Sequence, residues 1–266
     1  MGRLSKSGVA AGLLLTLLSA NLQGQNIEAY PAQEWSEIAA ADAQLDQTKI
    51  DRLFDLSFQD SATQGVVLIK NGLLVGERYA DGFSTDSYGT SWSMAKSFYA
   101  ALIGISIDRG EIMSLDDPVA LYLEYFNDER RDITLRDLLN MTSGLDFPDH
   151  EHEDMFFSAD HLDYARNVGV EKQAGVMFEY NNVNSMLLAD ILLQATGVAA
   201  DTLLRERIFD KIGLDDVTLW QDSAGNPLTY CCVDTTARQY ARFGLLFARD
   251  GNWNGEQIIP KQFVDE

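Results

Sequence analysis

The sequence predicts an α+β fold in which an antiparallel sheet flanked by helices is followed by a mainly helical region. Two apolar, β-prone runs at 65–70 and 73–79 enclose Asn71-Gly72. This dipeptide is the strongest short-range hairpin signal, because both of its residues adopt the positive φ that a tight turn needs. Helical periodicity follows the hairpin and dominates the chain beyond Gly110.

The first helix after the hairpin begins in the stretch SWSMAKSF, which contains Ser93-x-x-Lys96. Gly110 is suited to end it, because glycine takes the left-handed C-cap conformation. Its apolar face is formed by residues at i, i+3, i+4 and i+7, namely Phe98, Ala101, Leu102 and Ile105. The pattern predicts that Ser93 lies in the first turn, with Lys96 one turn further along on the same face.

Ser93 and Lys96 form a candidate catalytic pair. A serine hydroxyl is a poor nucleophile until a neighbour takes its proton, and a desolvated lysine can do so. The free N–H groups at the start of the helix, including that of Ser93, could stabilise an oxyanion. Since about one Ser-x-x-Lys is expected by chance in a chain of this length, the motif alone fits an ordinary helix start with an exposed lysine equally well.

Further helices are predicted in the second half of the chain. Thr134 and Asp137 have the spacing of a capping box at the start of a helix. A longer helix is predicted at 183–196, where Gly197 provides the stop. Additional helices are expected near 200–210 and 235–249.

A second group of polar residues, Tyr180-x-Asn182, directly precedes the helix at 183–196. A tyrosine on such a turn can point its phenol into a cleft, where a nearby ammonium favours the phenolate and so assists proton transfer. Asn182 could hydrogen-bond the lysine or a substrate amide. Tyr125-x-Asn127 has the same spacing, but Tyr125 follows an apolar run and is interpreted as a core aromatic.

The three histidines, His150, His152 and His161, lie close together in an acidic segment. The His-x-His spacing is compatible with a metal site, but we interpret the segment as a solvated acidic loop, and we expect no metal or cofactor. The only cysteines are the neighbours Cys231 and Cys232. A bond between them is possible in an oxidising compartment, although two buried free thiols are the favoured interpretation.

Residues 1–24 resemble a secretory signal peptide, with Arg3 and Lys6 ahead of the apolar run at 9–18. We therefore expect a periplasmic or secreted protein, with an uncleaved membrane anchor as the alternative. The net charge is −21, and without the two basic residues of the leader it becomes −23. Such a charge disfavours nucleic acid and anionic lipid surfaces as partners.

With Ser93-x-x-Lys96 and Tyr180-x-Asn182 some ninety residues apart, the chain resembles the serine hydrolases related to class C β-lactamases and penicillin-binding proteins. It is most similar to the 6-aminohexanoate-dimer hydrolase branch, in the blocks SWSMAKSF, TLRDLLNMTSGLDF, FEYNNVNSMLLADIL and YCCVDTTARQYARFGLLF. The resemblance covers roughly residues 60–266 and implies a β-lactamase/transpeptidase-like fold.

The resemblance implies a reaction through an acyl enzyme. Ser93 would attack an amide or ester carbonyl, and Lys96 and Tyr180 would share the proton transfers, although which of them is the base in each step stays open. Asn182 would bind substrate. The alternatives are a non-catalytic relative that binds cell-wall peptides or a partner, and a metal-binding protein that uses the histidine cluster.

The order of the predicted strands and helices indicates how the chain is divided. We expect a sheet-bearing part at 25–112 and a mainly helical part at 113–266. Members of this family usually carry a third motif, such as Lys-Thr-Gly, on a strand beyond the point where this sequence ends. Because residues 258–266 have the pattern of a helix start, with Pro260 in its first turn, we expect the sequence to be a fragment without its C-terminal strands.

Overall fold

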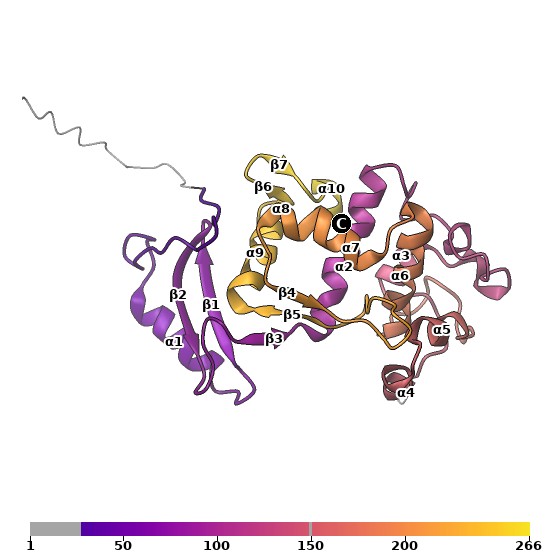
Figure 1. Cartoon of the computed structure of the whole chain (residues 1–266), viewed down its shortest axis with the longest axis horizontal. Coiled ribbons are helices and arrows are strands. Elements are labelled where there is room, and N and C mark those ends of the chain that lie inside the picture. The colour runs from indigo at the N-terminus through magenta and orange to yellow at the C-terminus, as the bar shows by residue number, and fades with distance from the viewer. Residues whose placement is uncertain (1–27, 149–150) are drawn as a thin grey trace, which may run out of the picture.

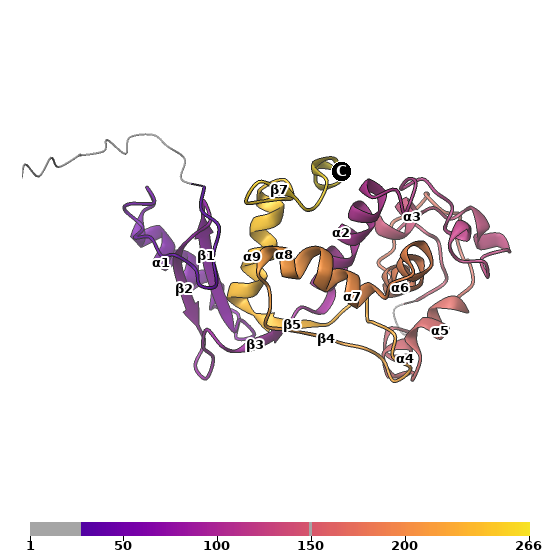
Figure 2. The ribbon, with the colours of Figure 1, turned by 45° about the horizontal axis from the view of Figure 1, so that its top comes forward.

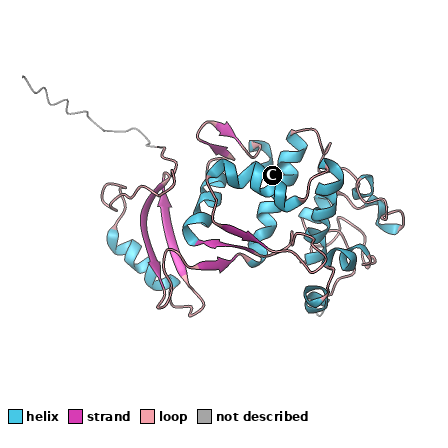
Figure 3. Cartoon of the chain, in the orientation of Figure 1, coloured by secondary structure: helices cyan, strands magenta, loops and turns pink. Residues whose placement is uncertain are grey.

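The computed structural model describes residues 28–148 and 151–266. Helices and antiparallel strands are combined in an α+β architecture, as predicted (Figure 1). A two-stranded hairpin stands at one side of the molecule, and the opposite side consists of helices and loops (Figure 3). The predicted signal segment and His150 lie outside the described residues.

The predicted hairpin is confirmed. Strand β1 (Gly65–Lys70) pairs antiparallel with β2 (Leu73–Tyr79). The turn residues Asn71 and Gly72 have φ values of 53° and 80°. A Cβ atom at Gly72 would lie 1.7 Å from the carbonyl oxygen of Ala29, so only glycine fits at this position.

The two faces of the hairpin pack against different partners. Val66 and Leu68 face helix α1 (Gln47–Ser57), whose Phe54 is buried against them. The intervening residues, Val67 and Ile69, join the main core instead, as the two-residue period of a strand requires. Helix α9 (Ala237–Ala248) packs against β1, so a late segment of the chain returns to the N-terminal hairpin (Figures 1 and 2).

A second small sheet joins segments that are distant in the sequence. Strand β5 (Val233–Thr236) lies between β3 (Tyr88–Thr90) and β4 (Val217–Leu219), and both pairings are antiparallel. Because β3 leads directly into the Ser93 turn, this sheet places the segment before β5 beside that turn.

The helix that follows Ser93 forms the centre of the main core. Helix α2 (Ala95–Asp108) begins directly after a 3₁₀ turn, η1 (Trp92–Met94), and ends ahead of Gly110, which has a φ of 70°. The expected apolar face is buried, and much of the rest of α2 is buried as well. A helix that is apolar nearly all round is typical of a protein centre, and burial on this scale fixes the position of the Ser93 turn.

The remaining elements are mainly helices, most of them short. They are η2 (Val119–Leu121), η3 (Glu129–Asp132), α3 (Leu135–Leu139), α4 (Glu151–Phe157), α5 (His161–Arg166), α6 (Asn182–Thr196), α7 (Ala200–Leu204), the π-helical η4 (Arg205–Phe209), α8 (Asp210–Ile212) and α10 (Lys261–Asp265), together with the hairpin β6 (Asn252–Trp253) and β7 (Glu256–Gln257).

Several of the predicted helix ends are confirmed. The capping box is present, with the Thr134 side chain accepting from Asp137 N and the Asp137 side chain accepting from Thr134 N. Helix α6 stops at Gly197, which has a left-handed φ of 75°. Helix α3 ends at Leu139, and Met141 shortly after it adopts a left-handed φ of 57°.

Helix α6 is rich in apolar residues, and most of it is buried inside the protein. Across the described ranges, no single helix is both long and apolar enough to cross a membrane. Together, α6 and the segment Ala200–Ile212 form a bent pair that has the length and the apolar composition of a membrane span. Its apolar residues are part of the protein core.

Candidate active site

Ser93 lies in η1, where the chain passes from β3 into α2, and its side chain is exposed. The preceding Trp92 has a φ of 45°, a left-handed conformation that costs a residue other than glycine about 1–3 kcal/mol. Strain of this kind is typical of functional sites. The turn is held by Ser91, whose N–H donates to the Val233 carbonyl at 2.8 Å and whose hydroxyl accepts from Val233 N at 2.9 Å.

Lys96 contacts Ser93 from the first turn of α2. Its Nζ lies 3.2 Å from the Ser93 hydroxyl and 2.7 Å from the carbonyl oxygen of Tyr230, to which it donates. Burial lowers the pKa of Lys96 from 10.5 to about 7. A lysine with such a pKa is partly neutral near pH 7 and can therefore accept a proton.

Tyr180 is brought to the same amine from the other half of the chain. The centre of its ring lies 5.0 Å from Lys96 Nζ, and the ring of Tyr230 lies 5.7 Å from the same atom. Tyr180 is 42% exposed, so its phenol is accessible to a substrate. It is positioned by Asn181, which caps α6 through a hydrogen bond from Val183 N to its side chain.

Asn182 lies beside Ser93 in the same cavity, but its hydrogen bond goes to a residue that we did not expect. Its Nδ2 lies 2.7 Å from His152 Nδ1. In the part of the chain that the structure describes, the buried Asn182 Oδ1 has no hydrogen-bond partner. Of the two partners considered for Asn182, Lys96 receives no hydrogen bond from it in the described part of the chain.

The acidic residues Glu153 and Asp154 of the histidine segment are exposed to solvent, as expected, but the described part of the segment is not a loop. Residues Glu151–Phe157 form helix α4, whose Met155 is buried in the core. His152 stacks on Tyr180, with ring centres 6.5 Å apart and planes inclined by 14°. The alternation of acidic residues and histidines suggested a polar loop. The apolar residues Met155 and Phe156, which follow directly, were the feature of the sequence that indicated a packed helix.

The two remaining candidates in the sequence have structural roles. The Tyr125 hydroxyl donates to Asp190 at 2.9 Å, and its ring packs on the core, as predicted. His161 is buried, and its Nδ1 lies 3.1 Å from the Tyr230 hydroxyl. Burial lowers the pKa of His161 and so favours the neutral ring. Within 28–148 and 151–266, no three His, Cys, Asp or Glu side chains are grouped so as to hold a metal ion.

Cys231 and Cys232 are buried, as predicted, but they form a disulfide, which corrects the expectation of free thiols. The sequence could not decide this point, because two neighbouring thiols are close enough to bond only in particular backbone conformations. Cys232 adopts such an unusual conformation, with a φ of 75°. Cys231 lines the cavity that contains Ser93.

The cavity at Ser93 has a volume of about 290 Å³. Its wall is mostly aromatic and contains one carboxylate, with Trp92, Phe156, Phe157, Tyr230 and Glu153 among its lining residues. On the other side of Trp92, a groove of about 840 Å³ is bordered by the hairpin, β3 and α9. Trp92 lines both spaces, whereas Ser93 lines only the smaller one.

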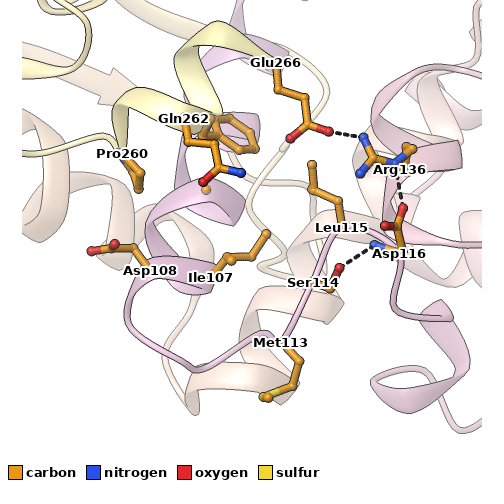
Figure 4. Close-up of a pocket in the computed structure, with 12 residues that line it drawn as sticks. Ile107, Asp108, Met113, Ser114, Leu115, Asp116, Arg136, Pro260, Gln262 and Glu266 are labelled. Atoms are coloured by element: carbon orange, nitrogen blue, oxygen red, sulfur yellow. Dashed lines mark hydrogen bonds and ion pairs between the residues drawn. The ribbon is translucent and has the colours of Figure 1, made fainter.

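A further cavity, of about 420 Å³, lies at the opposite end of α2 (Figure 4). There Arg136 pairs with Asp116 at 2.6 Å and with Glu266. A Cβ atom at Gly104 would lie 2.4 Å from the ring of Phe263, so glycine allows α10 to pack on α2. The length of α2, about 20 Å, separates this cavity from Ser93, and we assign it no part in the chemistry.

Known proteins resemble this chain over much of its length. The family model described as Beta-lactamase matches residues 50–261. A D-aminopeptidase of Brucella anthropi is 31% identical over 178 residues, which are 60% of this chain and 33% of that protein. The 6-aminohexanoate-dimer hydrolase of Paenarthrobacter ureafaciens is 23% identical over 238 residues, which are 80% of this chain and 59% of that enzyme.

Solved structures share the fold. A penicillin-binding protein homologue from Caulobacter crescentus superimposes with a TM-score of 0.66 at 18% identity, over 82% of this chain and 73% of that one. The similarity in structure therefore extends over most of the chain. The chain spans between one third and about three fifths of the length of the two curated relatives.

Proposed function

Because the chain belongs to the Beta-lactamase family, and is thus related to serine hydrolases, we propose that it cleaves an amide or ester bond through an acyl-Ser93 intermediate. The observation that carries the proposal is the 3.2 Å contact between Lys96 Nζ and the Ser93 hydroxyl, made by an amine whose pKa is lowered to about 7. An exposed hydroxyl beside a partly neutral amine is the arrangement that nucleophilic catalysis requires.

In the acylation step, the Ser93 oxygen attacks the substrate carbonyl carbon while its proton passes to a neighbouring base. Lys96 is the group in contact with that hydroxyl. Tyr180, whose ring lies beside the Lys96 amine, returns a proton to the leaving amine or alcohol. Water then attacks the acyl enzyme and releases the acid. Proton transfers of this kind typically contribute about 10²–10⁴ in rate.

The oxyanion that forms in each step needs hydrogen-bond donors. The N–H of Ser93 lies at the start of the η1–α2 helical segment, where backbone donors lack partners within the helix. It is the donor we assign to the oxyanion. Asn182 lines the same cavity as Ser93, so its side-chain amide is the group that we assign to substrate binding.

The substrate is a small amide, an ester or a D-amino-acid peptide. The names of two relatives, a D-aminopeptidase and a 6-aminohexanoate-dimer hydrolase, support amide bonds in particular. The open groove and the mostly aromatic cavity on either side of Trp92 suit a linear molecule with apolar parts.

A fluorophosphonate probe tests the proposal directly. We expect mass spectrometry to find one adduct, on Ser93, and Ser93→Ala to abolish it. Ser97, also exposed and one turn further along, provides the matched control, because Ser97→Ala should leave labelling unchanged. A folded protein that acquires no adduct on Ser93 would contradict the proposal and favour a relative that binds peptides without cleaving them.

We also propose that the protein is exported, on the basis of the signal pattern at 1–24. The Cys231–Cys232 disulfide supports this, because disulfides persist mainly in oxidising compartments. Fusing residues 1–24 to a reporter that is active only after export should give activity. The same fusion with Leu14→Arg, which interrupts the apolar run, should not.

A further inference from the structure

The disulfide between Cys231 and Cys232 directly follows a residue that holds the proposed base. The carbonyl oxygen of Tyr230 accepts from Lys96 Nζ at 2.7 Å, the shorter of the two hydrogen bonds recorded for that amine. The direction of this carbonyl is set by the backbone of Tyr230 and Cys231. A change in the backbone at the disulfide would therefore move the acceptor that orients Lys96.

The other side of the disulfide is attached to the Ser93 turn. Val233 exchanges two hydrogen bonds with Ser91, at 2.8 and 2.9 Å. The segment 230–233 thus contacts the catalytic turn both before and after Ser93. The distance between these two points of attachment depends on the conformation of the two cysteines between them.

Cys232 has a φ of 75°, in the left-handed region that residues other than glycine rarely adopt. Its carbonyl accepts from Trp220 N at 3.2 Å, whereas Cys231 N donates to the Leu228 carbonyl at 3.3 Å. These backbone bonds are long compared with the contacts at Lys96 and Ser91. The disulfide closes a small ring that contains the peptide bond between the two residues, and so restricts the torsions on both sides of it.

We propose that the Cys231–Cys232 disulfide is a positioning element for acylation, which keeps Cys232 left-handed and thereby directs the Tyr230 carbonyl at Lys96. The inference rests on the proposed function, since it assigns the disulfide a role in the same reaction. It also predicts sensitivity to a dithiol reductant. The reductant is oxidised to its own disulfide, Cys231 and Cys232 each become a thiol, and the ring opens.

Two double variants separate the covalent bond from the backbone conformation. Cys231→Ala with Cys232→Ala removes the ring and leaves an L-residue that disfavours a positive φ. Cys231→Ala with Cys232→Gly also removes the ring, but glycine adopts a positive φ without penalty. Both variants carry the same change at Cys231, which lines the cavity, so the comparison between them isolates position 232. At pH values well above the Lys96 midpoint, where the amine is neutral in both, we expect the fluorophosphonate to acylate Ser93 about tenfold or more faster in the Ala/Gly variant than in the Ala/Ala variant.

The state of Lys96 gives a readout that does not depend on turnover. Its labelling by fluorodinitrobenzene at a series of pH values, followed by mass spectrometry, reports the midpoint at which the amine loses its proton. A carbonyl acceptor favours the ammonium form, so the midpoint should fall by about one pH unit in the Ala/Ala variant and stay in place in the Ala/Gly variant.

Reduction of the native protein with dithiothreitol should reproduce the Ala/Ala behaviour, and it covers the case in which that variant does not fold. The Ala/Gly variant, which has no disulfide, should be insensitive to the reagent. Lys96 midpoints that are unchanged or higher after reduction would overturn the proposal, as would an Ala/Gly variant as slow as Ala/Ala. If the untreated protein forms no adduct on Ser93, the proposed function fails, whereas the Lys96 labelling still tests the positioning role.

Discussion

The amine of Lys96 donates a hydrogen bond to the carbonyl oxygen of Tyr230 across 2.7 Å. A carbonyl can only accept, so it always directs an N–H of Lys96 toward itself. Once the amine is neutral, its lone pair is left for another donor, and the Ser93 hydroxyl at 3.2 Å is the donor in reach. This relationship makes the protonation state of Lys96 the basis of the first two predictions.

Acylation should become faster as the pH rises through about 7. The pKa of Lys96 is lowered to about 7 by burial, so the amine is protonated below that value and cannot accept the serine proton. The rate of fluorophosphonate labelling should fall about tenfold for each pH unit below 6. Lys96→Arg should lose about 10²–10⁴ in rate, because a guanidinium stays protonated.

The control for this experiment is Lys49→Arg, a change of the same kind at an exposed position of α1. It should leave both the rate and the pH profile as they are in the wild type. A profile that stays flat from pH 5 to 9 while the protein remains folded would contradict a role for neutral Lys96.

The same buried amine should reduce stability in a defined pH range. The pKa of Lys96 is about 7 in the folded protein and 10.5 as the reference value, so between these pH values the unfolded chain binds a proton that the folded chain releases. Stability therefore rises with pH across this range, and below it the folded state bears the full cost of burying the charge. Lys96→Met should raise the melting temperature at pH 6.

The gain from Lys96→Met should decrease as the pH approaches 10.5, which differential scanning calorimetry of the two proteins at matched pH can measure. Subtracting the wild type removes the contribution of every other titrating group. A variant that is less stable than wild type at pH 6 would show that the contacts of Lys96 with Ser93 and Tyr230 outweigh the burial of its charge.

Tyr180→Phe should lower kcat by about 10²–10⁴ and leave the fold intact. The change removes the hydroxyl but keeps the ring beside Lys96 Nζ, where it also stacks on His152. The other Tyr-x-Asn of the chain provides the control. Tyr125→Phe removes the hydrogen bond to Asp190 and should cost about 0.5–1.5 kcal/mol of stability without changing kcat. Loss of activity in Tyr125→Phe alone would reverse the assignment of the two motifs.

The parts of the fold that could be predicted from the sequence depend on local chemistry. Asn71-Gly72 determines a tight turn by itself, and the capping box of Thr134 and Asp137 satisfies the start of a helix from within three residues. The small sheet was not predicted. Its strands are only three or four residues long, and β5 pairs with β3 across more than half of the chain, so no local pattern identifies the partners.

The candidate site also combines contacts that local sequence predicts with contacts that only the tertiary fold determines. The contact between Ser93 and Lys96 follows from their spacing at a helix start. The Tyr230 carbonyl was missed because any backbone carbonyl can accept a hydrogen bond, and only the tertiary fold selects one. His152 was assigned to a loop because its neighbours are acidic, whereas its place beside Asn182 is set by the packing of α4.

The cavity at Ser93 should favour acyl chains that end in an ammonium group over those that end in a carboxylate. Its lining is mostly aromatic, and Glu153 is the carboxylate among the lining residues. Because Glu153 is exposed, its attraction for a cation should be about 0.2–1 kcal/mol, or up to about fivefold in kcat/KM. Nitrophenyl esters of 6-aminohexanoate, hexanoate and adipate, compared at low ionic strength, measure this preference.

Glu153→Gln should remove most of this preference, whereas Asp154→Asn, on the same helix but outside the cavity lining, should preserve it. Equal ratios for wild type and Glu153→Gln would show that the selection is made in the groove on the other side of Trp92.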